Sequence, residues 1–167
     1  MSKKTLVRSA ETSLAELYER PGFLIRRAHQ IAVSIFLEET GDLGITNTQY
    51  GILFVLKNRP GIDQISVAKL LGLDRSTAGM VLGKLEEAGL VERTLGVSDR
   101  RRRTLHLTRA GAHMLERLKT PARRAQSRVL EPFSADERKT FLKLLERLAG
   151  TLNETTRVPV ADDRATP

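Results

Sequence analysis

A run of arginines carries the clearest chemistry in the chain. Asp99 is followed by Arg100, Arg101, Arg102 and Arg103, so four guanidinium groups stand beside one carboxylate. Neighbouring positive charges repel one another, and the run is therefore costly unless a polyanion neutralises it. An arginine on a projecting loop can enter the minor groove of DNA, where the potential is most negative. The alternative is a solvated turn, which is what most charge runs are.

Two capped helical segments joined by a glycine precede the arginines. Asp63 can cap a short helix, Gly72 supplies a tight turn, and Asp74 can cap a longer helix that ends at Gly89. This is helix-turn-helix spacing, in which the second helix lies in the major groove of DNA. The alternative is that the hydroxyl residues of the second segment only start a helix. The residues expected to contact DNA are Arg75, Ser76, Thr77, Met80 and Lys84.

The elements before this pattern read as helices. The segment from Phe23 to about Thr40 is apolar on nearly all sides, which indicates burial from several directions. In so short a chain, a second copy of the protein is a natural cover. Thr46 begins a capping box whose helix ends at Pro60-Gly61.

After the helix-turn-helix pattern, the sequence predicts two strands followed by further helices. Residues 90–95 and 103–108 read as two short strands, with the arginines at the hairpin tip between them. Thr108 can cap a further helix, which Pro121 should kink or divide. Ser134 opens a second capping box and a last helix.

The amino-acid composition limits the classes of function that the chain can have. The chain has 167 residues, a net charge of +8 and a pI near 10.3, which favours a polyanionic partner such as nucleic acid. Absence of cysteine excludes disulfides and cysteine-based metal sites, and it fits the cytoplasm. We expect no metal, no cofactor and no membrane span. There is no Gly-rich phosphate loop and no nucleophile motif, so an enzyme is the least favoured class.

These motifs together resemble the MarR-type winged-helix transcription regulators over about residues 23–150. The resemblance implies a mainly α fold with a small β-hairpin wing, that is, a winged helix-turn-helix with a helical dimerisation region. The specific motifs are Leu-Asp-Arg-Ser-Thr at 73–77, Leu-Glu-Glu-Ala-Gly-Leu-Val-Glu-Arg at 85–93, Asp99-x-Arg101, and Leu105-x-Leu107-Thr108-x-x-Gly111.

The resemblance also implies a domain division. An N-terminal extension and the first dimerisation and effector helix would occupy residues 1–45, and the DNA-binding lobe residues 46–110. The C-terminal dimerisation helices would occupy residues 111–150, and a flexible tail residues 151–167. The implied assembly is an obligate homodimer on a pseudo-palindromic operator in double-stranded DNA, with half-sites about one helical turn apart.

By resemblance, Arg101 is the minor-groove arginine and Asp99 orients it, with Arg100 and Arg102 beside them. One position departs from the family. Many relatives carry an arginine where this chain has Met80, which favours apolar contact with a thymine methyl group there.

Residues 21–30, Pro-Gly-Phe-Leu-Ile-Arg-Arg-Ala-His-Gln, resemble the first helix of MarR-type repressors that sense phenolic or aromatic acids. In such relatives the first arginine of the pair anchors the ligand carboxylate, and that arginine corresponds to Arg26. Some relatives place a histidine six residues further on, where this chain has Ala32. His29 is the candidate replacement; the alternative is a buried histidine satisfied by protein groups.

The other candidate effector residues have structural alternatives as well. Arg27, like its neighbour, can instead pair with Glu38, Glu39 or another carboxylate of the protein, or lie exposed. Tyr50 and Phe54 can line an aromatic pocket or simply pack in the core. Further along, three arginines suit the phosphates of a coenzyme A thioester, an approach to DNA, or a solvated helix face. They are Arg123, Arg124 and Arg128.

The function predicted from these observations is a ligand-responsive, DNA-binding repressor of aromatic-compound catabolism genes. An aromatic carboxylate or its coenzyme A thioester would release it from DNA. Two alternatives remain at this point: a constitutive or architectural DNA-binding protein without an effector, and a winged-helix module that binds other proteins.

Overall fold

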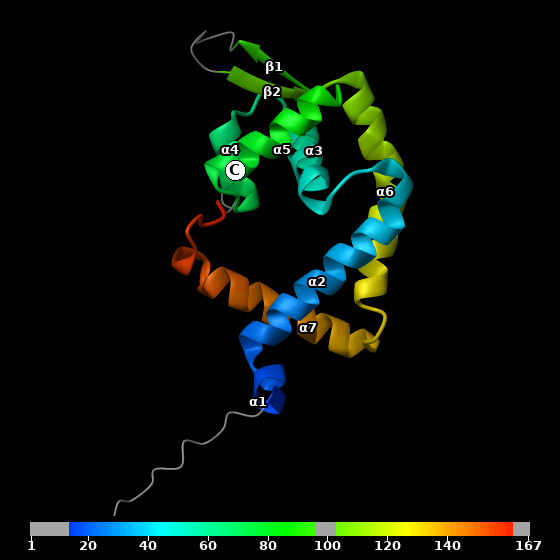
Figure 1. Cartoon of the computed structure of the whole chain (residues 1–167), viewed down its shortest axis with the longest axis vertical. Coiled ribbons are helices and arrows are strands. Elements are labelled where there is room, and N and C mark those ends of the chain that lie inside the picture. Colours follow the sequence, from blue (N-terminus) through cyan, green and yellow to red (C-terminus); the bar gives the residue numbers. More distant parts are fainter. Residues whose placement is uncertain (1–13, 96–102, 162–167) are drawn as a thin grey trace, which may run out of the picture.

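The computed structural model describes residues 14–95 and 103–161, and within them the chain is mainly helical (Figure 1). The first part comprises α1 (Leu14–Glu19), α2 (Pro21–Thr40), the short 3-10 helix η1 (Gly41–Leu43), α3 (Asn47–Asn58), α4 (Gln64–Leu71) and α5 (Arg75–Glu87). The second part comprises strands β1 (Val91–Leu95) and β2 (Arg103–Leu107), then α6 (Arg109–Val129), α7 (Ala135–Thr151) and the 3-10 helix η2 (Asn153–Thr155).

Local side-chain caps fix the ends of most helices, as the sequence predicts. At α3, Thr46 accepts from the Gln49 amide while the Gln49 side chain accepts from the Thr46 amide, which confirms the capping box. The second predicted capping box is present at the start of α7, where Ser134 is the N-cap residue. Gly72 adopts the left-handed conformation, with φ of 62°, that the turn between α4 and α5 requires.

The main core lies inside the lobe formed by α3, α4, α5 and the two strands. Its fully buried side chains include Ile52, Leu82, Leu85 and Leu105. The strands pair antiparallel, with Val91 opposite Leu107, and the hydrophobic base of this ribbon closes the core. The predicted winged helix-turn-helix is confirmed in these elements.

The Thr108-x-x-Gly111 motif has a packing reason. A Cβ on Gly111 would lie 1.9 Å from the carbonyl oxygen of Leu90, closer than any side chain can approach. The Thr108 hydroxyl donates to the Gly89 carbonyl at 2.7 Å and accepts from the Gly111 amide at 3.0 Å. The start of α6 is therefore held directly against the end of α5.

A second, smaller cluster joins α2 to α6. Phe36 packs with Ala122 and Ala125, and the C-terminal part of α2 crosses α6 in Figure 1. Pro121 was expected to kink or divide this helix, but α6 continues unbroken from Arg109 to Val129. A proline inside a helix removes its own amide hydrogen bond and crowds the carbonyl four residues before it, and packing of the buried residues on either side keeps both halves in one helix.

The end of the chain differs from the loose tail expected from residue 151. The Asn153 side chain donates to the Val160 carbonyl at 3.0 Å and accepts from the Val160 amide at 2.9 Å. The Ala161 amide donates to the Lys69 carbonyl at 3.1 Å, and Val160 lies against Gly72. Residues 153–161 thus tie the end of α7 to the turn of the helix-turn-helix, beside the C label in Figure 1.

In the single chain, α2 buries only Phe36 and Thr40, although its sequence is apolar nearly all round. No residue of α1 or α7 is buried. Large apolar side chains therefore remain exposed on these three helices. They are Leu14, Leu17, Tyr18, Leu24, Ile25, Ile31, Leu37, Leu142, Leu144, Leu145 and Leu148.

Candidate DNA interface and effector site

The outer face of α5 is the centre of the candidate DNA interface. Its inner face, which includes Ala78, Leu82 and Leu85, is buried in the core. Ser76 and Met80 are four residues apart and therefore share the opposite face. Both are exposed, and Met80 exposes 57% of its surface although it is apolar. Arg75 and Lys84 are exposed as well, whereas Thr77 is half-buried.

Asp74 gathers the hydroxyl groups at the start of α5. The Ser76 hydroxyl donates to one carboxylate oxygen at 2.5 Å, and the Thr77 hydroxyl donates to the other at 2.6 Å. The Thr77 amide also donates to this carboxylate, at 2.8 Å. These bonds, from Ser76 first and Thr77 second, hold the pKa of the Asp74 carboxyl far below its usual range. The hydroxyls do start the helix, as the structural alternative held, and Ser76 is also exposed on its outer face.

Two glycines inside α5 were not selected from the sequence. A glycine in a helix interior costs roughly 0.5–1 kcal/mol relative to alanine, so each needs a reason. At Gly79, a Cβ would lie 3.1 Å from the Gln64 amide nitrogen, which explains the small residue. At Gly83, nothing lies within 4 Å of that position, so no contact within the described chain explains it. The signal available in the sequence was the presence of two glycines within one predicted helix.

A hydrogen-bonded network that the sequence did not reveal supports α5 from behind. Arg93 on β1 donates to both carboxylate oxygens of Glu86 at 2.8 Å and to the Gln64 side chain at 3.1 Å. The Gln64 amide group donates in turn to the Arg75 carbonyl at 3.4 Å. One arginine thereby joins α4, α5 and β1, and it fixes the orientation of the outer face of α5.

The wing begins as an ordinary two-stranded ribbon. The hydroxyls of Thr94 and Thr104 lie 3.0 Å apart across it, and Leu95 with Arg103 forms its last pair. Figure 1 shows the ribbon at the edge of the lobe that contains α4 and α5. The predicted wing-tip residues lie outside the described residues. They are Asp99, Arg100, Arg101 and Arg102.

The candidate effector residues of α2 are exposed. The Arg26 guanidinium lies over the Phe23 ring, 5.0 Å from its centroid, and Arg27 donates to the Gln30 side chain at 3.4 Å. His29 is exposed rather than buried and satisfied by the protein. Neither arginine pairs with the two carboxylates at the end of α2, because eleven or more residues of helix separate them by at least about 15 Å.

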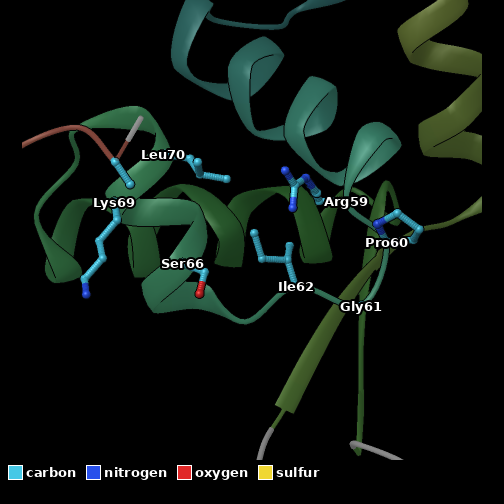
Figure 2. Close-up of a pocket in the computed structure, with 8 residues that line it drawn as sticks. Arg59, Pro60, Gly61, Ile62, Ser66, Lys69 and Leu70 are labelled. Atoms are coloured by element: carbon cyan, nitrogen blue, oxygen red, sulfur yellow. The ribbon is translucent and has the colours of Figure 1, made fainter. Parts of the chain in front are cut away.

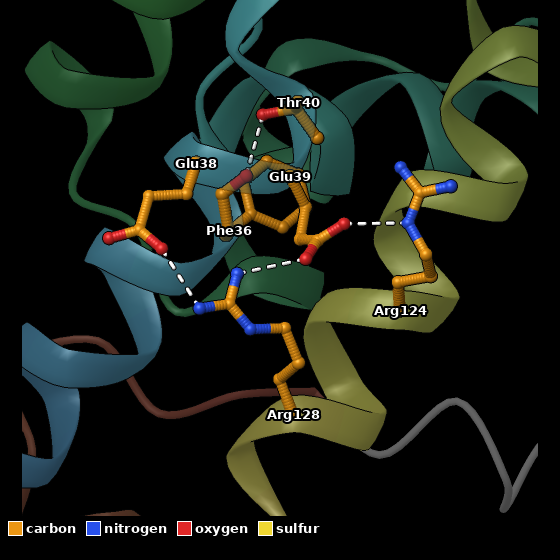
Figure 3. Close-up of polar contacts among 6 residues, drawn as sticks. All are labelled: Phe36, Glu38, Glu39, Thr40, Arg124 and Arg128. Carbon is orange, nitrogen blue, oxygen red and sulfur yellow. Dashed lines mark hydrogen bonds and ion pairs between the residues drawn. The ribbon is translucent and has the colours of Figure 1, made fainter.

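Those two carboxylates instead bind α6 (Figure 3). Glu39 accepts from Arg124 at 2.6 Å and from Arg128 at 2.8 Å, and Glu38 accepts from Arg128 at 2.9 Å. The Arg124 hydrogen bond, followed by that of Arg128, lowers the pKa of the Glu39 carboxyl. We call these four residues the α2–α6 brace. Two of the three arginines considered for thioester phosphates are therefore already neutralised, while Arg123 is exposed.

The candidate aromatic residues form a row between α2 and α3. The Tyr50 ring lies 5.7 Å from that of Phe36 and 6.2 Å from that of Phe54, centroid to centroid. Tyr50 is half-buried and Phe54 is 53% exposed. Phe36 was not selected from the sequence, although it is the buried end of the row. Arg26 lies ten residues before it, about 15 Å along α2, so the single chain does not place Arg26 beside this row.

An open cavity of about 440 Å³ lies elsewhere, on the DNA-binding lobe (Figure 2). Arg59, Ile62, Ser66 and Lys69 line it from the α3–α4 linker and α4, together with Ala161 from the end of the chain. None of the predicted effector residues lines this cavity. It is therefore separate from the aromatic row.

Residues 14–95 and 103–161 contain neither a membrane-spanning helix nor a cluster of metal ligands. No helix there is long and apolar enough to cross a membrane. In the same residues, no group of three or more histidine, cysteine, aspartate or glutamate side chains could hold a metal ion.

Known proteins resemble this chain in sequence. The sequence pattern of the MarR family matches residues 43–102. The putative transcriptional regulatory protein for the hcr operon of Thauera aromatica is 36% identical over 152 residues, which cover 87% of this chain and 92% of that protein.

Solved structures agree with the fold. The repressor CouR bound to a 23-mer DNA duplex has a TM-score of 0.75 and 33% identity over 84% of this chain and 99% of CouR. CouR bound to p-coumaroyl-CoA has a TM-score of 0.75 and 31% identity over 83% and 98%. PcaV from Streptomyces coelicolor in complex with its natural ligand has a TM-score of 0.72 and 34% identity over 80% and 94%. Sequence and fold agree over nearly the whole length of these proteins, so the chain belongs to the MarR family and is a winged-helix, DNA-binding transcriptional repressor rather than an enzyme.

Proposed function

We propose that this repressor controls genes for the breakdown of aromatic compounds and that an aromatic carboxylate or its coenzyme A thioester releases it from its operator. The observation that carries the proposal is an exposed cation on an apolar helix. Arg26 lies over the Phe23 ring on α2, and helical spacing places Val33 and the exposed Leu37 on the same face. A flat aromatic acid offers a carboxylate for bidentate contact with the guanidinium and an apolar body for these neighbours.

The assembly in this proposal is a homodimer. The exposed apolar side chains of α1, α2 and α7 are more than a monomeric protein usually leaves uncovered, and a second copy would bury them. The dimer would present two copies of α5 to half-sites of a pseudo-palindrome about one helical turn apart. It would also enclose the effector residues that the single chain leaves open.

On DNA, each α5 would contact the major groove through Arg75, Ser76, Thr77, Met80 and Lys84. The wing-tip residues would contact the minor groove, with Arg101 inserted, Asp99 orienting it, and Arg100 and Arg102 on the adjacent phosphates. The repressor CouR, of similar fold, has been solved both on a DNA duplex and with p-coumaroyl-CoA, which supports a DNA site and an effector site in one chain.

Effector release needs a difference in affinity between two states. The aromatic acid must bind the DNA-free dimer more tightly than the DNA-bound dimer, because a ligand with equal affinity for both shifts nothing. Movement of α2 would reach the DNA-binding lobe through the α2–α6 brace and through the contact between α6 and the end of α5.

A screen for DNA release tests this proposal. Free aromatic acids and their coenzyme A thioesters are titrated in parallel into the protein–operator complex, and the remaining complex is measured. Release by one class at micromolar to millimolar concentration supports the proposal and identifies the form of the effector. If no acid or thioester releases the DNA, the second candidate function is favoured, which is a constitutive DNA-binding protein. The observation in favour of this candidate is the separation of Arg26 from the aromatic row in the single chain.

A further inference from the structure

We propose that Asp74 sets the hydrogen-bonding polarity of the DNA-reading helix, so that Ser76 and Thr77 present only acceptors and select the amino groups of adenine or cytosine. The inference rests on the proposed contact between α5 and the major groove. It adds a specificity-determining residue, Asp74, that does not itself need to touch DNA.

The geometry leaves the two hydroxyl protons no choice. An ionised carboxylate accepts hydrogen bonds and cannot donate them. Both carboxylate oxygens of Asp74 lie within 2.6 Å of a hydroxyl oxygen, one from Ser76 and one from Thr77. Each hydroxyl has a single proton, and that proton must lie in its bond to Asp74. Distances this short are typical of bonds between a hydroxyl and a charged carboxylate.

What remains on each hydroxyl is a pair of acceptor lone pairs. In the major groove, the hydrogen-bond donors on the bases are the N6 amino group of adenine and the N4 amino group of cytosine. Guanine offers N7 and O6 and thymine offers O4, all of which are acceptors. Phosphate oxygens are acceptors too. The hydroxyls of Ser76 and Thr77 can therefore bond an amino group and have no proton left for guanine, thymine or the backbone.

The position of Ser76 makes it the principal reader of the two. It is exposed on the outer face of α5, in line with Met80, whereas Thr77 is half-buried at the edge of that face. The negative charge of Asp74 acts in the same direction, because it repels phosphate oxygens and attracts the positive end of an N–H bond. Asp74 thus biases this part of the helix toward base edges.

One isosteric substitution reverses the polarity without removing the helix cap. In Asp74→Asn the amide oxygen can still accept from the Thr77 backbone, and asparagine is among the preferred N-cap residues. The oxygen that accepts from the Thr77 amide also accepts from the Ser76 hydroxyl, so the new NH₂ group takes the place of the other oxygen and donates to the Thr77 hydroxyl. That hydroxyl proton is then free to point outward, and the variant can bond guanine, thymine or phosphate.

The chain contains a matched control. Asp63 caps α4 in the same way, accepting from the Ile65 and Ser66 amides at 2.9 and 3.0 Å and from the Ser66 hydroxyl at 3.0 Å. Its hydroxyl partner lies on α4 rather than on the DNA-reading helix. Asp63→Asn therefore makes the same chemical change away from the base edges.

The experiment begins by selecting duplexes from a randomised library with the full-length protein and with both variants. In the duplex that the wild type enriches, each adenine is then replaced singly by purine and each cytosine by pyrimidin-2-one, which lack the amino group. We expect one replacement per half-site to weaken wild-type binding about five- to tenfold, the equivalent of one hydrogen bond. At a base that Thr77 reads, Asp74→Asn should be insensitive to that replacement and should enrich guanine or thymine, whereas a base that Ser76 reads should stay sensitive; Asp63→Asn should behave as the wild type does.

The outcomes separate this inference from the function on which it rests. If the wild type enriches a sequence but binds every amino-deleted duplex equally well, the polarity assignment is overturned and the DNA interface stands. If Asp74→Asn and the wild type enrich identical sequences, the assignment is overturned for Thr77. If the wild type enriches no sequence at all, the proposed interface itself fails. Circular dichroism of Asp74→Asn checks that the variant remains folded.

Discussion

Gly83 lies on the outer side of α5, and within the described residues no atom beyond its own stretch of helix lies within 4 Å of the position that a Cβ would occupy. Gly83→Ala should therefore raise the free energy of unfolding by roughly 0.5–1 kcal/mol, because alanine favours the helix. If the DNA backbone occupies that space, the same methyl group should weaken operator binding. Thermal melting and a binding titration measure the two effects.

Gly150→Ala is the matched control, since it also places a methyl group in an empty position on a helix, α7, away from α5. It should change DNA affinity little. A Gly83→Ala protein that is more stable and binds its operator as well as the wild type does would exclude close approach of DNA at this glycine.

Gly111 is the opposite case, because the Leu90 carbonyl occupies the space that a Cβ on this glycine would need. Gly111→Ala must push α6 away from the end of α5, and overpacking against a backbone atom should lower the free energy of unfolding by about 3 kcal/mol. Chemical denaturation measures this loss. Ala112→Ser, at the next position and half-buried, should cost much less; equal losses would mean that the close contact is not the cause.

At the scale of elements, the α2–α6 brace makes stability depend on pH. The pKa of Glu39 is lowered in the folded protein by Arg124 and Arg128, so the folded state binds the proton less well than the unfolded state. The stabilisation is therefore complete above the ordinary carboxyl pKa of 4.5 and is lost as the pH falls through the lower, folded value. Glu39→Gln should melt below the wild type at pH 7, and the two should converge in acid.

Melting curves between pH 7 and pH 3 check this convergence. Glu116→Gln is the control, because among the residues that the structure describes Glu116 has a single ion pair, with Lys119 at 3.9 Å on the surface. It should leave the pH dependence almost unchanged. A constant difference between the wild type and Glu39→Gln at every pH would show that the brace does not act through the charge of Glu39.

Elements defined by local chemistry were predictable from the sequence. The caps at Thr46, Asp74 and Thr108 each act within three residues, so the residue types and spacing suffice to place them. The network around Arg93 was not predictable, because it joins Gln64 to a strand 29 residues later. Only the fold brings these side chains together.

Longer-range packing also decided the points on which the sequence misled. Pro121 was expected to kink or divide its helix, and tertiary contacts keep α6 undivided through it. Residues after 151 read as loose, yet Asn153 closes a loop on Val160 that reaches the turn at Gly72. For the candidate effector site, the sequence indicated Tyr50 and Phe54 but not Phe36, whose role depends on how α2 crosses α3.

At the scale of the whole molecule, the single chain leaves the apolar surfaces of α2 and α7 exposed, together with the side chain of Arg26. We propose that a second copy of the chain and an aromatic acid cover them together. The effector then binds within the dimerisation region and acts on DNA through the orientation of the two lobes. DNA binding and effector response should therefore be separable by mutation.

The most direct test is a titration of the protein–operator complex with the most active aromatic acid or thioester, for wild type, Arg26→Ala and the neighbouring control Arg27→Ala. All three proteins should bind the operator with similar affinity. The wild type and Arg27→Ala should be released at similar ligand concentrations, whereas Arg26→Ala should need at least about tenfold more ligand, because it lacks the charge-assisted anchor. Release of Arg26→Ala at the wild-type concentration would show that Arg26 does not anchor the effector.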